Sequence, residues 1–99
     1  MIVNYDINNP VVLGDKPVLL DFYAEWCGPC KMLGKVLEEY SDKHPELLIV
    51  KVDVDECEEV VEGYGVANLP TLIYYEPQDF KWRHVGALTL KQLEEILNA

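Results

Sequence analysis

Apolar residues along the chain form several runs of strand length. Almost continuous apolar runs predict strands covered on both faces of a sheet, whereas alternation predicts a strand with one solvent-facing side. Prolines and turn-forming residues separate most of these runs. The predicted strands are residues 2–5, 18–23, 47–52, 71–75 and, with alternating character, 80–85.

A second pattern, with apolar residues three and four positions apart, predicts three helices. The first covers residues 29–44 and is stopped by a proline. The second begins at Asp55 and the third at Thr89, each a capping side chain followed three residues later by Glu or Gln. Gly63 and Gly65 mark the end of the second helix.

This order of elements predicts an α/β fold with a central mixed sheet of four to five strands flanked by helices on both faces. Residues 17–52 form a βαβ unit with parallel strands and a right-handed crossover, and residues 71–85 form an antiparallel hairpin. Residues 8–14 predict a turn followed by a brief helix or loop. No linker or repeat divides the chain, so we expect a single domain over residues 1–99.

The charge and hydropathy of the chain bear on which partners it can bind and where it is located. Eight basic against eighteen acidic residues give a formal net charge of -10, which repels phosphate backbones and anionic membrane surfaces. No apolar run is long enough to span a bilayer, and the first residues lack the basic and apolar regions of a signal peptide. We therefore expect a cytoplasmic protein that binds neither nucleic acid nor membrane.

The stretch WCGPC, residues 26–30, sets two thiols three positions apart where a strand gives way to a helix. Unpaired N–H groups of the first helical turn point toward the sulfur of Cys27 and favour its thiolate, lowering its pKa by roughly one unit from about 8.5. Only a thiolate attacks a disulfide. Because Gly28 and Pro29 add no positive charge, the pair Cys27 and Cys30 suits a reductant better than an oxidant.

The residues alone leave two other uses of these thiols open, a structural staple and a metal site. A disulfide that closes so small a loop constrains the unfolded chain little. Zinc requires about four ligands, whereas Cys57, His44 and His84 are scattered without ligand spacing. We therefore expect a redox-active disulfide, no metal site and no bound cofactor.

Four segments, in order, resemble the thioredoxin family: DFYAEWCGPCK, KVDVDE, YGVANLPTL and VGAL. The resemblance covers almost the whole chain from Val18 to Ala99. It implies the thioredoxin fold and a thiol-disulfide oxidoreductase that reduces protein disulfides, with a part in electron transport and cell redox homeostasis. The implied partners are thioredoxin reductase and disulfide-containing proteins, and we expect a monomer.

Four residues match the family's catalytic positions. Cys27 resembles the exposed nucleophile that forms a mixed disulfide, and Cys30 resembles the buried thiol that resolves it. Asp21 matches a buried acid behind the disulfide; independently, a lone carboxylate inside an apolar strand has a raised pKa, which suits a general base for Cys30. Alternatively, Asp21 lies at a strand edge facing water. Lys51 matches a lysine near that acid, or else it extends into solvent.

The resemblance also implies an apolar surface around the cysteines that contacts substrates. Pro70 resembles the family's cis-proline, which would turn the backbone of Leu69 toward an extended substrate segment; a trans proline that opens a strand is the alternative. Trp26 belongs to this surface unless it is a core aromatic. The full set is Trp26, Gly28, Pro29, Val54, Val66, Ala67, Leu69, Pro70, Gly86 and Ala87.

Some residues depart from the family's usual pattern or lie outside its site. Tyr23 stands where the best-known members carry a second tryptophan, and Lys35 replaces a helix-kinking proline. We expect Cys57 to be a small core residue rather than a regulatory thiol. The acidic run within residues 53–62 is expected to be a solvated helix start, with steering of partners by charge as the alternative.

Two rival functions share many of these features. One is a glutathione-linked or isomerase-type protein of the same fold, which would differ in its reduction potential. The other is a non-catalytic binding module that holds a partner on the same surface. A binding module has no need of Asp21 and Cys30 together with a Gly-Pro spacer, so a protein-disulfide reductase is the main prediction.

Overall fold

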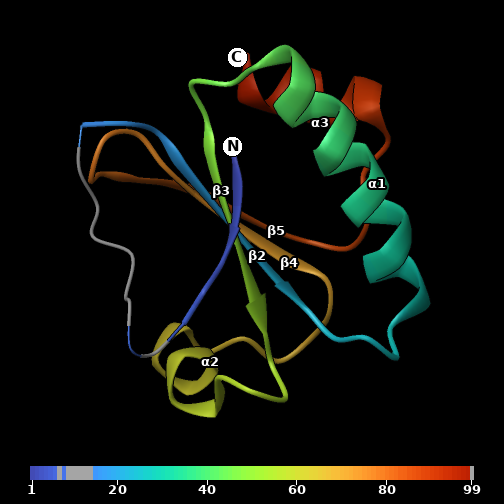
Figure 1. The fold of residues 1–99 in the computed structure, drawn as a ribbon, viewed down its shortest axis with the longest axis vertical. Coiled ribbons are helices and arrows are strands. Elements are labelled where there is room, and N and C mark those ends of the chain that lie inside the picture. Colours follow the sequence, from blue (N-terminus) through green and yellow to red (C-terminus); the bar gives the residue numbers. More distant parts are fainter. Residues whose placement is uncertain (7, 9–14, 99) are drawn as a thin grey trace.

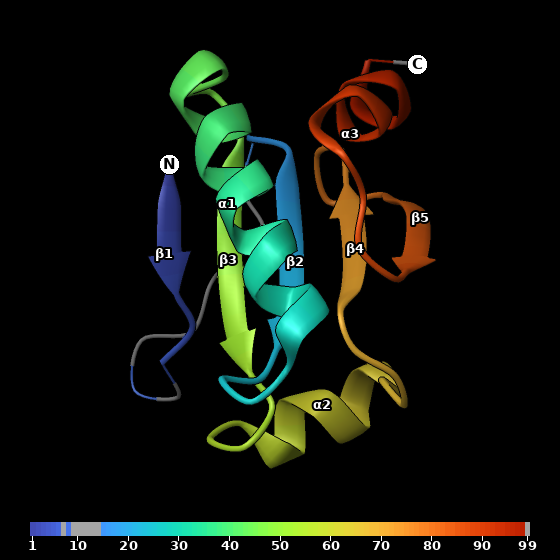
Figure 2. The same ribbon diagram turned by 90° about the vertical axis from the view of Figure 1, so that its right-hand side faces the viewer.

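The computed structural model describes residues 1–6, 8 and 15–98. The elements in chain order are β1 (Ile2–Asn4), β2 (Val18–Tyr23), α1 (Gly28–Lys43), β3 (Leu48–Asp53), α2 (Glu58–Tyr64), β4 (Thr71–Tyr75), β5 (Phe80–Val85) and α3 (Leu90–Leu97). Within the described residues the strands form one five-stranded sheet (Figure 1), in the order β1-β3-β2-β4-β5 that Figure 2 shows. The pairs β1–β3 and β3–β2 are parallel, while β2–β4 and β4–β5 are antiparallel, so the sheet is mixed as predicted.

Helices lie on both faces of this sheet because its central strands are apolar on both sides. Side chains alternate along β2: Leu19 packs in a cluster with residues of α1 and α3, and Phe22 packs on the opposite face with residues of α2. Figure 2 shows α1 and α3 in front of the sheet, with α2 crossing below it. Two apolar clusters, one on each face, therefore hold the layers together.

Most predicted elements are confirmed to within a residue or two. The bounds of β2, β4 and β5 are those predicted, β3 begins and ends one residue later, and the antiparallel hairpin of β4 and β5 is present. The brief helix or loop predicted within residues 8–14 lies outside the described residues, apart from Asn8. The backbone N–H of Asn8 donates to Oδ1 of Asp6 at 2.9 Å, as in a turn.

The predicted start of the second helix is wrong. Asp55 does not cap it; α2 begins three residues later, and Cys57 occupies the N-cap without a side-chain capping bond. The Asp55 carboxylate instead accepts a hydrogen bond from Nε1 of Trp26 at 2.8 Å. The backbone N–H of Asp55 donates to Oδ1 of Asp53 at 2.9 Å, forming a turn before the helix. The Asp55 carboxylate, predicted to cap α2, therefore binds Trp26 from a distant segment of the chain instead.

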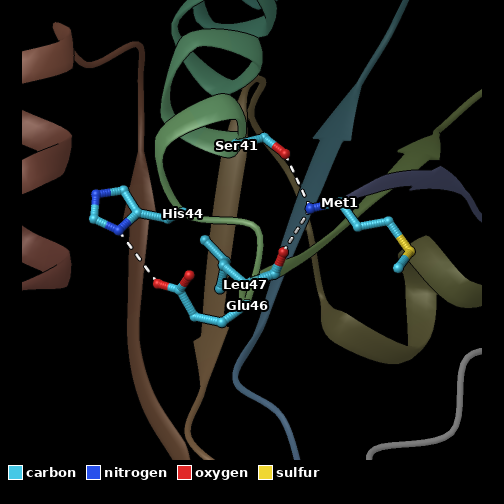
Figure 3. Close-up of polar contacts among 5 residues, drawn as sticks. All are labelled: Met1, Ser41, His44, Glu46 and Leu47. Atoms are coloured by element: carbon cyan, nitrogen blue, oxygen red, sulfur yellow. Dashed lines mark hydrogen bonds and ion pairs between the residues drawn. The ribbon is translucent and has the colours of Figure 1, made fainter.

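The C-terminal end of α1 packs beside the start of the chain. The amine nitrogen of Met1 donates to Oγ of Ser41 at 3.0 Å and to the carbonyl of Leu47 at 2.9 Å (Figure 3). His44 ends the helix, and its Nδ1 lies 3.2 Å from Oε1 of Glu46. These polar contacts lie at the opposite end of α1 from the cysteines, and they join the start of the chain to the segment between α1 and β3.

The predicted N-cap of the last helix is confirmed and gives a test of local stability. Oγ1 of Thr89 accepts from the backbone N–H of Gln92 at 3.1 Å, and Oε1 of Gln92 accepts from the backbone N–H of Thr89 at 3.0 Å. Replacing Thr89 with Ala should lower the free energy of unfolding by about 1 kcal/mol, because the backbone N–H of Gln92 loses its acceptor. Urea denaturation measures this change. The control Thr89→Ser keeps the hydroxyl and should retain most of the stability; an equal loss would show that the cap is not the cause.

Candidate active site

The two cysteines of the WCGPC stretch lie at the first turn of α1, as predicted. Cys27 is the N-cap residue with extended backbone (φ -91°, ψ 109°), and Pro29 occupies the first helical turn, where its missing N–H costs nothing. The backbone N–H of Cys30 donates to Sγ of Cys27 at 3.2 Å. The structure contains a disulfide between Cys27 and Cys30, with Cα atoms 5.2 Å apart. The helix end therefore directs an N–H group at this sulfur, as the sequence predicted.

The predicted contrast between an exposed and a buried cysteine is much smaller in the structure. Cys27 is 7% exposed and Cys30 is 4% exposed, so both are buried. Both pack with Ala24, and partly buried side chains from neighbouring loops, including Val54 and Leu69, close over them. The description of Cys27 as exposed is therefore wrong for this disulfide form. The two cysteines differ instead in the cleft that each one lines.

Cys27 lines an apolar groove between the start of α1 and the segments on either side of α2. We call it the Cys27 groove; it is lined by Trp26, Cys27, Val54, Val61, Val66, Ala67, Asn68 and Leu69. Five residues of the predicted contact surface gather here: Trp26, Val54, Val66, Ala67 and Leu69. Sequence reasoning missed Val61, which also packs against the apolar cluster near α2, and Asn68, a polar residue within an apolar motif. Spacing along the chain contained no signal for either.

The other predicted contact residues surround this groove less closely. Gly28 and Pro29 are exposed on the first turn of α1. Pro70 is buried, its bond to Leu69 is cis as predicted, and its carbonyl accepts from the backbone N–H of Gly86 at 2.8 Å. Ala87 instead lines a second groove, between α1 and the loop before α3. The structure therefore does not bring Ala87 into the Cys27 groove.

Trp26 is a surface residue and not a core aromatic. Its side chain is 71% exposed, and its Nε1 donates to Oδ2 of Asp55, which holds the indole ring beside the groove. An exposed aromatic ring with a fixed orientation offers a large apolar area to a partner at low entropic cost.

Asp21 is buried in the middle of the sheet, and the alternative of a strand edge facing water is wrong. It is 1% exposed, and neither carboxylate oxygen has a hydrogen-bond partner among the described residues. Alternation along β2 turns Asp21 to the same face as Leu19, the face that α1 covers. Burial raises the pKa of Asp21 from 3.8 to about 7, and the positive charge of Lys51 opposes part of that rise.

The sequence left open whether Lys51 lies near Asp21 or extends into solvent, and in the structure it does both. Its Cα pairs with that of Asp21 in the parallel ladder of β2 and β3, so both side chains stand on the α1 face. Its Nζ lies 4.5 Å from the centroid of the Tyr23 ring, in a cleft that Cys30 and Lys35 also line. Lys51 is thus half-exposed, and its charge still acts on Asp21.

Removing the Lys51 ammonium should raise the pKa of Asp21 further above about 7, because a stabilising charge is lost. The variant Lys51→Met keeps the length of the side chain. Carbon NMR of the Asp21 carboxyl in the oxidised protein measures the titration directly. Lys35→Met, in the same cleft, is the matched control and should leave the titration where it is. An unchanged or lowered pKa in Lys51→Met would contradict the assigned coupling.

Cys57 packs in a different apolar cluster from Cys27 and Cys30, and of the acidic residues around it Asp55 reaches the site by its bond to Trp26. Cys57 is half-buried and packs against the face of the sheet near α2. Burial raises the pKa of its thiol, and the carboxylates of Glu56, Asp53 and Asp6 raise it further. A thiol with a raised pKa is a weak nucleophile, in agreement with a packing role. The exposed carboxylates that follow in the first turn of α2 fit the predicted solvated helix start.

Among residues 1–6, 8 and 15–98, no three His, Cys, Asp or Glu side chains gather as metal ligands would. Within the same residues no helix is long and apolar enough to cross a membrane.

Comparison with known proteins decides the family. A model of the thioredoxin family matches residues 2–99. The chain belongs to the thioredoxin family. It is 41% identical over 90 residues to a thioredoxin of Pseudomonas aeruginosa, covering 90% of this chain and 83% of that one. It is 46% identical over 87 residues to a thioredoxin of Alicyclobacillus acidocaldarius, covering 87% and 83%.

The three-dimensional structure agrees with this assignment. The crystal structure of Fasciola hepatica thioredoxin is similar with a TM-score of 0.78 and 32% identity, covering 85% of this chain and 80% of that one. Family membership together with the Cys27–Cys30 pair identifies this thioredoxin as a thiol-disulfide oxidoreductase with protein-disulfide reductase activity. The rival functions of the same fold are not favoured.

Two departures from the usual thioredoxin pattern have a visible place in the structure. Tyr23, where a second tryptophan is usual, presents its ring to the Lys51 ammonium. Lys35 follows Gly34 inside a helix of 16 residues, so α1 continues through the position of the usual proline.

Proposed function

We propose that this thioredoxin reduces protein disulfides by a two-step exchange in which Cys27 attacks and Cys30 resolves. The observation that carries the proposal is the N–H of Cys30, 3.2 Å from Sγ of Cys27 at the N-terminus of α1. In the reduced form, a donor and a helix end at this sulfur favour its thiolate. Cys30, one turn inside the helix, has no equivalent position at the helix end.

The exchange balances over two attacks. First, the Cys27 thiolate attacks one sulfur of the substrate disulfide; that S–S bond breaks, a mixed disulfide forms, and the other substrate sulfur leaves as a thiolate that takes a proton from water. Second, Cys30 loses its proton, and its thiolate attacks Sγ of Cys27. The mixed disulfide breaks, the Cys27–Cys30 disulfide forms, and the second substrate thiol is released. Two electrons pass to the substrate.

Asp21 is the proposed acceptor of the Cys30 proton. Its burial on the face of the sheet covered by α1, with no hydrogen-bond partner among the described residues, supports this role. A pKa of about 7 leaves the carboxyl close to half-ionised near neutral pH, so it can both take and return a proton. Lys51 tunes this pKa from the neighbouring strand.

The Cys27 groove is the proposed docking surface for substrates. Its apolar lining and the exposed Trp26 ring support contact with an extended segment of a partner protein. The backbone of Leu69, before the cis bond to Pro70, would pair with that segment. Gly28, Pro29, Gly86 and Ala87 would extend the contact around the groove.

We further propose that a thioredoxin reductase returns electrons to the disulfide, that the domain acts as a cytoplasmic monomer over residues 1–99, and that no bound cofactor is needed. Electrons travel on the thiol pair itself. The net charge of -10 supports protein partners over nucleic acids or anionic membranes.

Two assays test this function. Purified protein should reduce insulin when coupled to either an NADPH-linked or a ferredoxin-linked thioredoxin reductase, and testing each in turn identifies the donor. Redox titration against glutathione should give a potential near the general figure for thioredoxins, about -270 mV, and well below the isomerase figure of about -180 mV. A potential at the isomerase figure would support the rival function.

A further inference from the structure

The end of α2 leaves two carbonyl groups that the helix cannot satisfy itself. α2 has seven residues, none of them buried, and it ends at Gly65 in the left-handed conformation (φ 64°). The backbone N–H groups of Gly65 and Val66 donate back to Glu62 at 3.0 Å and Val61 at 3.1 Å. The carbonyls of Tyr64 and Gly65 take no part in this motif and can accept hydrogen bonds from another part of the chain or from water.

Arg83 supplies both donors from the far edge of the sheet. Its Nη1 donates to the carbonyl of Tyr64 at 2.7 Å, and its Nη2 donates to the carbonyl of Gly65 at 2.9 Å. Arg83 is held in the middle of β5, where its Cα pairs with that of Ile73 in β4. A guanidinium fork that spans two successive carbonyls fixes their direction, and its charge complements the negative end of the helix. One side chain therefore fastens the end of a weakly packed helix to the β4–β5 hairpin.

The residues that follow directly after this point, 66–69, form one wall of the Cys27 groove. The other end of that wall is also tied to the hairpin. Oγ1 of Thr71 donates to the carbonyl of Asn68 at 2.6 Å, and the backbone N–H of Gly86 donates to the carbonyl of Pro70 at 2.8 Å. Arg83 thus holds the start of the wall, and the backbone of the hairpin holds its end.

We infer that Arg83 is a positioning residue for protein substrates: it acts through the wall of residues 66–69 and does not touch the reacting sulfurs. This inference rests on the proposed docking of substrates in the Cys27 groove. A protein segment that lies along the groove needs the wall in one position, because a shift of about 1 Å in a docking surface is costly. A small disulfide reaches Cys27 without using the wall, so its reaction should not depend on Arg83.

The test compares two substrates with the same pre-reduced protein. Stopped-flow measurement gives the second-order rate constants for insulin and for the small disulfide 5,5′-dithiobis(2-nitrobenzoate). Arg83→Met should lower the insulin constant about five- to tenfold and change the small-disulfide constant less than about twofold. Arg83→Lys, which replaces the fork by a single ammonium, should fall between Arg83→Met and the unaltered protein. Lys81→Met, an exposed cation two residues earlier on the same strand, is the matched control and should leave both constants unchanged.

Hydrogen exchange provides a second readout that general destabilisation would not reproduce. In Arg83→Met the amide of Val66 should exchange about tenfold faster, while the amide of Ile73 in β4 keeps its rate. Two results with Arg83→Met would overturn the inference: an equal loss of the insulin and small-disulfide rate constants, or exchange that rises equally at the amides of Val66 and Ile73. Either would mean that Arg83 only stabilises the fold in general. An unchanged insulin constant in Arg83→Met would also overturn the inference. Failure of the unaltered protein to reduce insulin would instead refute the proposed function, so the two failures are distinguishable.

Discussion

Replacing Cys27 with Ser should reduce the rate of insulin reduction by this thioredoxin to that of the reductant alone. A serine hydroxyl stays protonated at neutral pH and forms no disulfide, so no mixed disulfide can form at the helix N-terminus. Turbidity of precipitating insulin chains, with dithiothreitol as the electron source, measures the loss. Cys57→Ser removes the third thiol and is the matched control, since this thiol has a raised pKa and does not line the groove.

The partner substitution separates the two thiols. Cys30→Ser should also stop turnover, but it leaves the attacking sulfur in place without the group that releases the substrate. A covalent complex should therefore accumulate. Mass spectrometry should give the mass of the chain plus one substrate, and dithiothreitol should separate the two by reducing their mixed disulfide. If the complex formed instead with Cys27→Ser, the roles of the two cysteines would be reversed. Turnover retained in Cys27→Ser would end the proposed mechanism altogether.

Much of the fold could be predicted because hydrophobic period and strand length are local properties. Val18–Tyr23 and Thr71–Tyr75 are almost continuously apolar and lie inside the sheet, as such runs predict. Thr89 with Gln92 fixed the start of α3 because both capping bonds lie within one turn. The start of α2 was misplaced because the carboxylate of Asp55 binds Trp26, 29 positions earlier, and no local pattern reports such a contact.

Those properties of the site that depend on residues adjacent in sequence could be predicted. The thiolate-favouring position of Cys27 depends on a cap and a helix start, both visible in WCGPC. The burial of Cys27 depends on Ala24, Val54 and Leu69, which come from three separate segments. Arg83 was missed for the same reason: alternation along β5 predicts that its side chain is exposed, but not that it reaches the carbonyls at the end of α2. Long-range contacts therefore set the shape of the groove around a locally encoded nucleophile.

The buried carboxyl of Asp21 makes the stability of the fold depend on pH in a direction opposite to that of a salt-bridged acid. Its folded pKa of about 7 lies above the ordinary value of 3.8, so the folded chain binds a proton more tightly than the unfolded chain does. Stability from this group is complete below about pH 4 and is lost as the pH rises toward and through about 7. At higher pH the fold must hold an unpaired buried charge, which costs up to about 4 kcal/mol relative to acid conditions.

Asp21→Asn should remove this dependence. Between pH 5 and pH 8.5 the oxidised protein should lose about 3 kcal/mol of unfolding free energy relative to the variant, because only the carboxyl ionises on the way. Guanidinium denaturation of both proteins, kept oxidised so that neither active-site thiol titrates, measures the difference at each pH. Asp42→Asn removes an exposed carboxylate from α1 and should give a profile parallel to that of the unaltered protein. Parallel profiles for Asp21→Asn as well would mean that the buried group does not titrate in this range, and the proposed proton acceptor for Cys30 would have to be sought elsewhere.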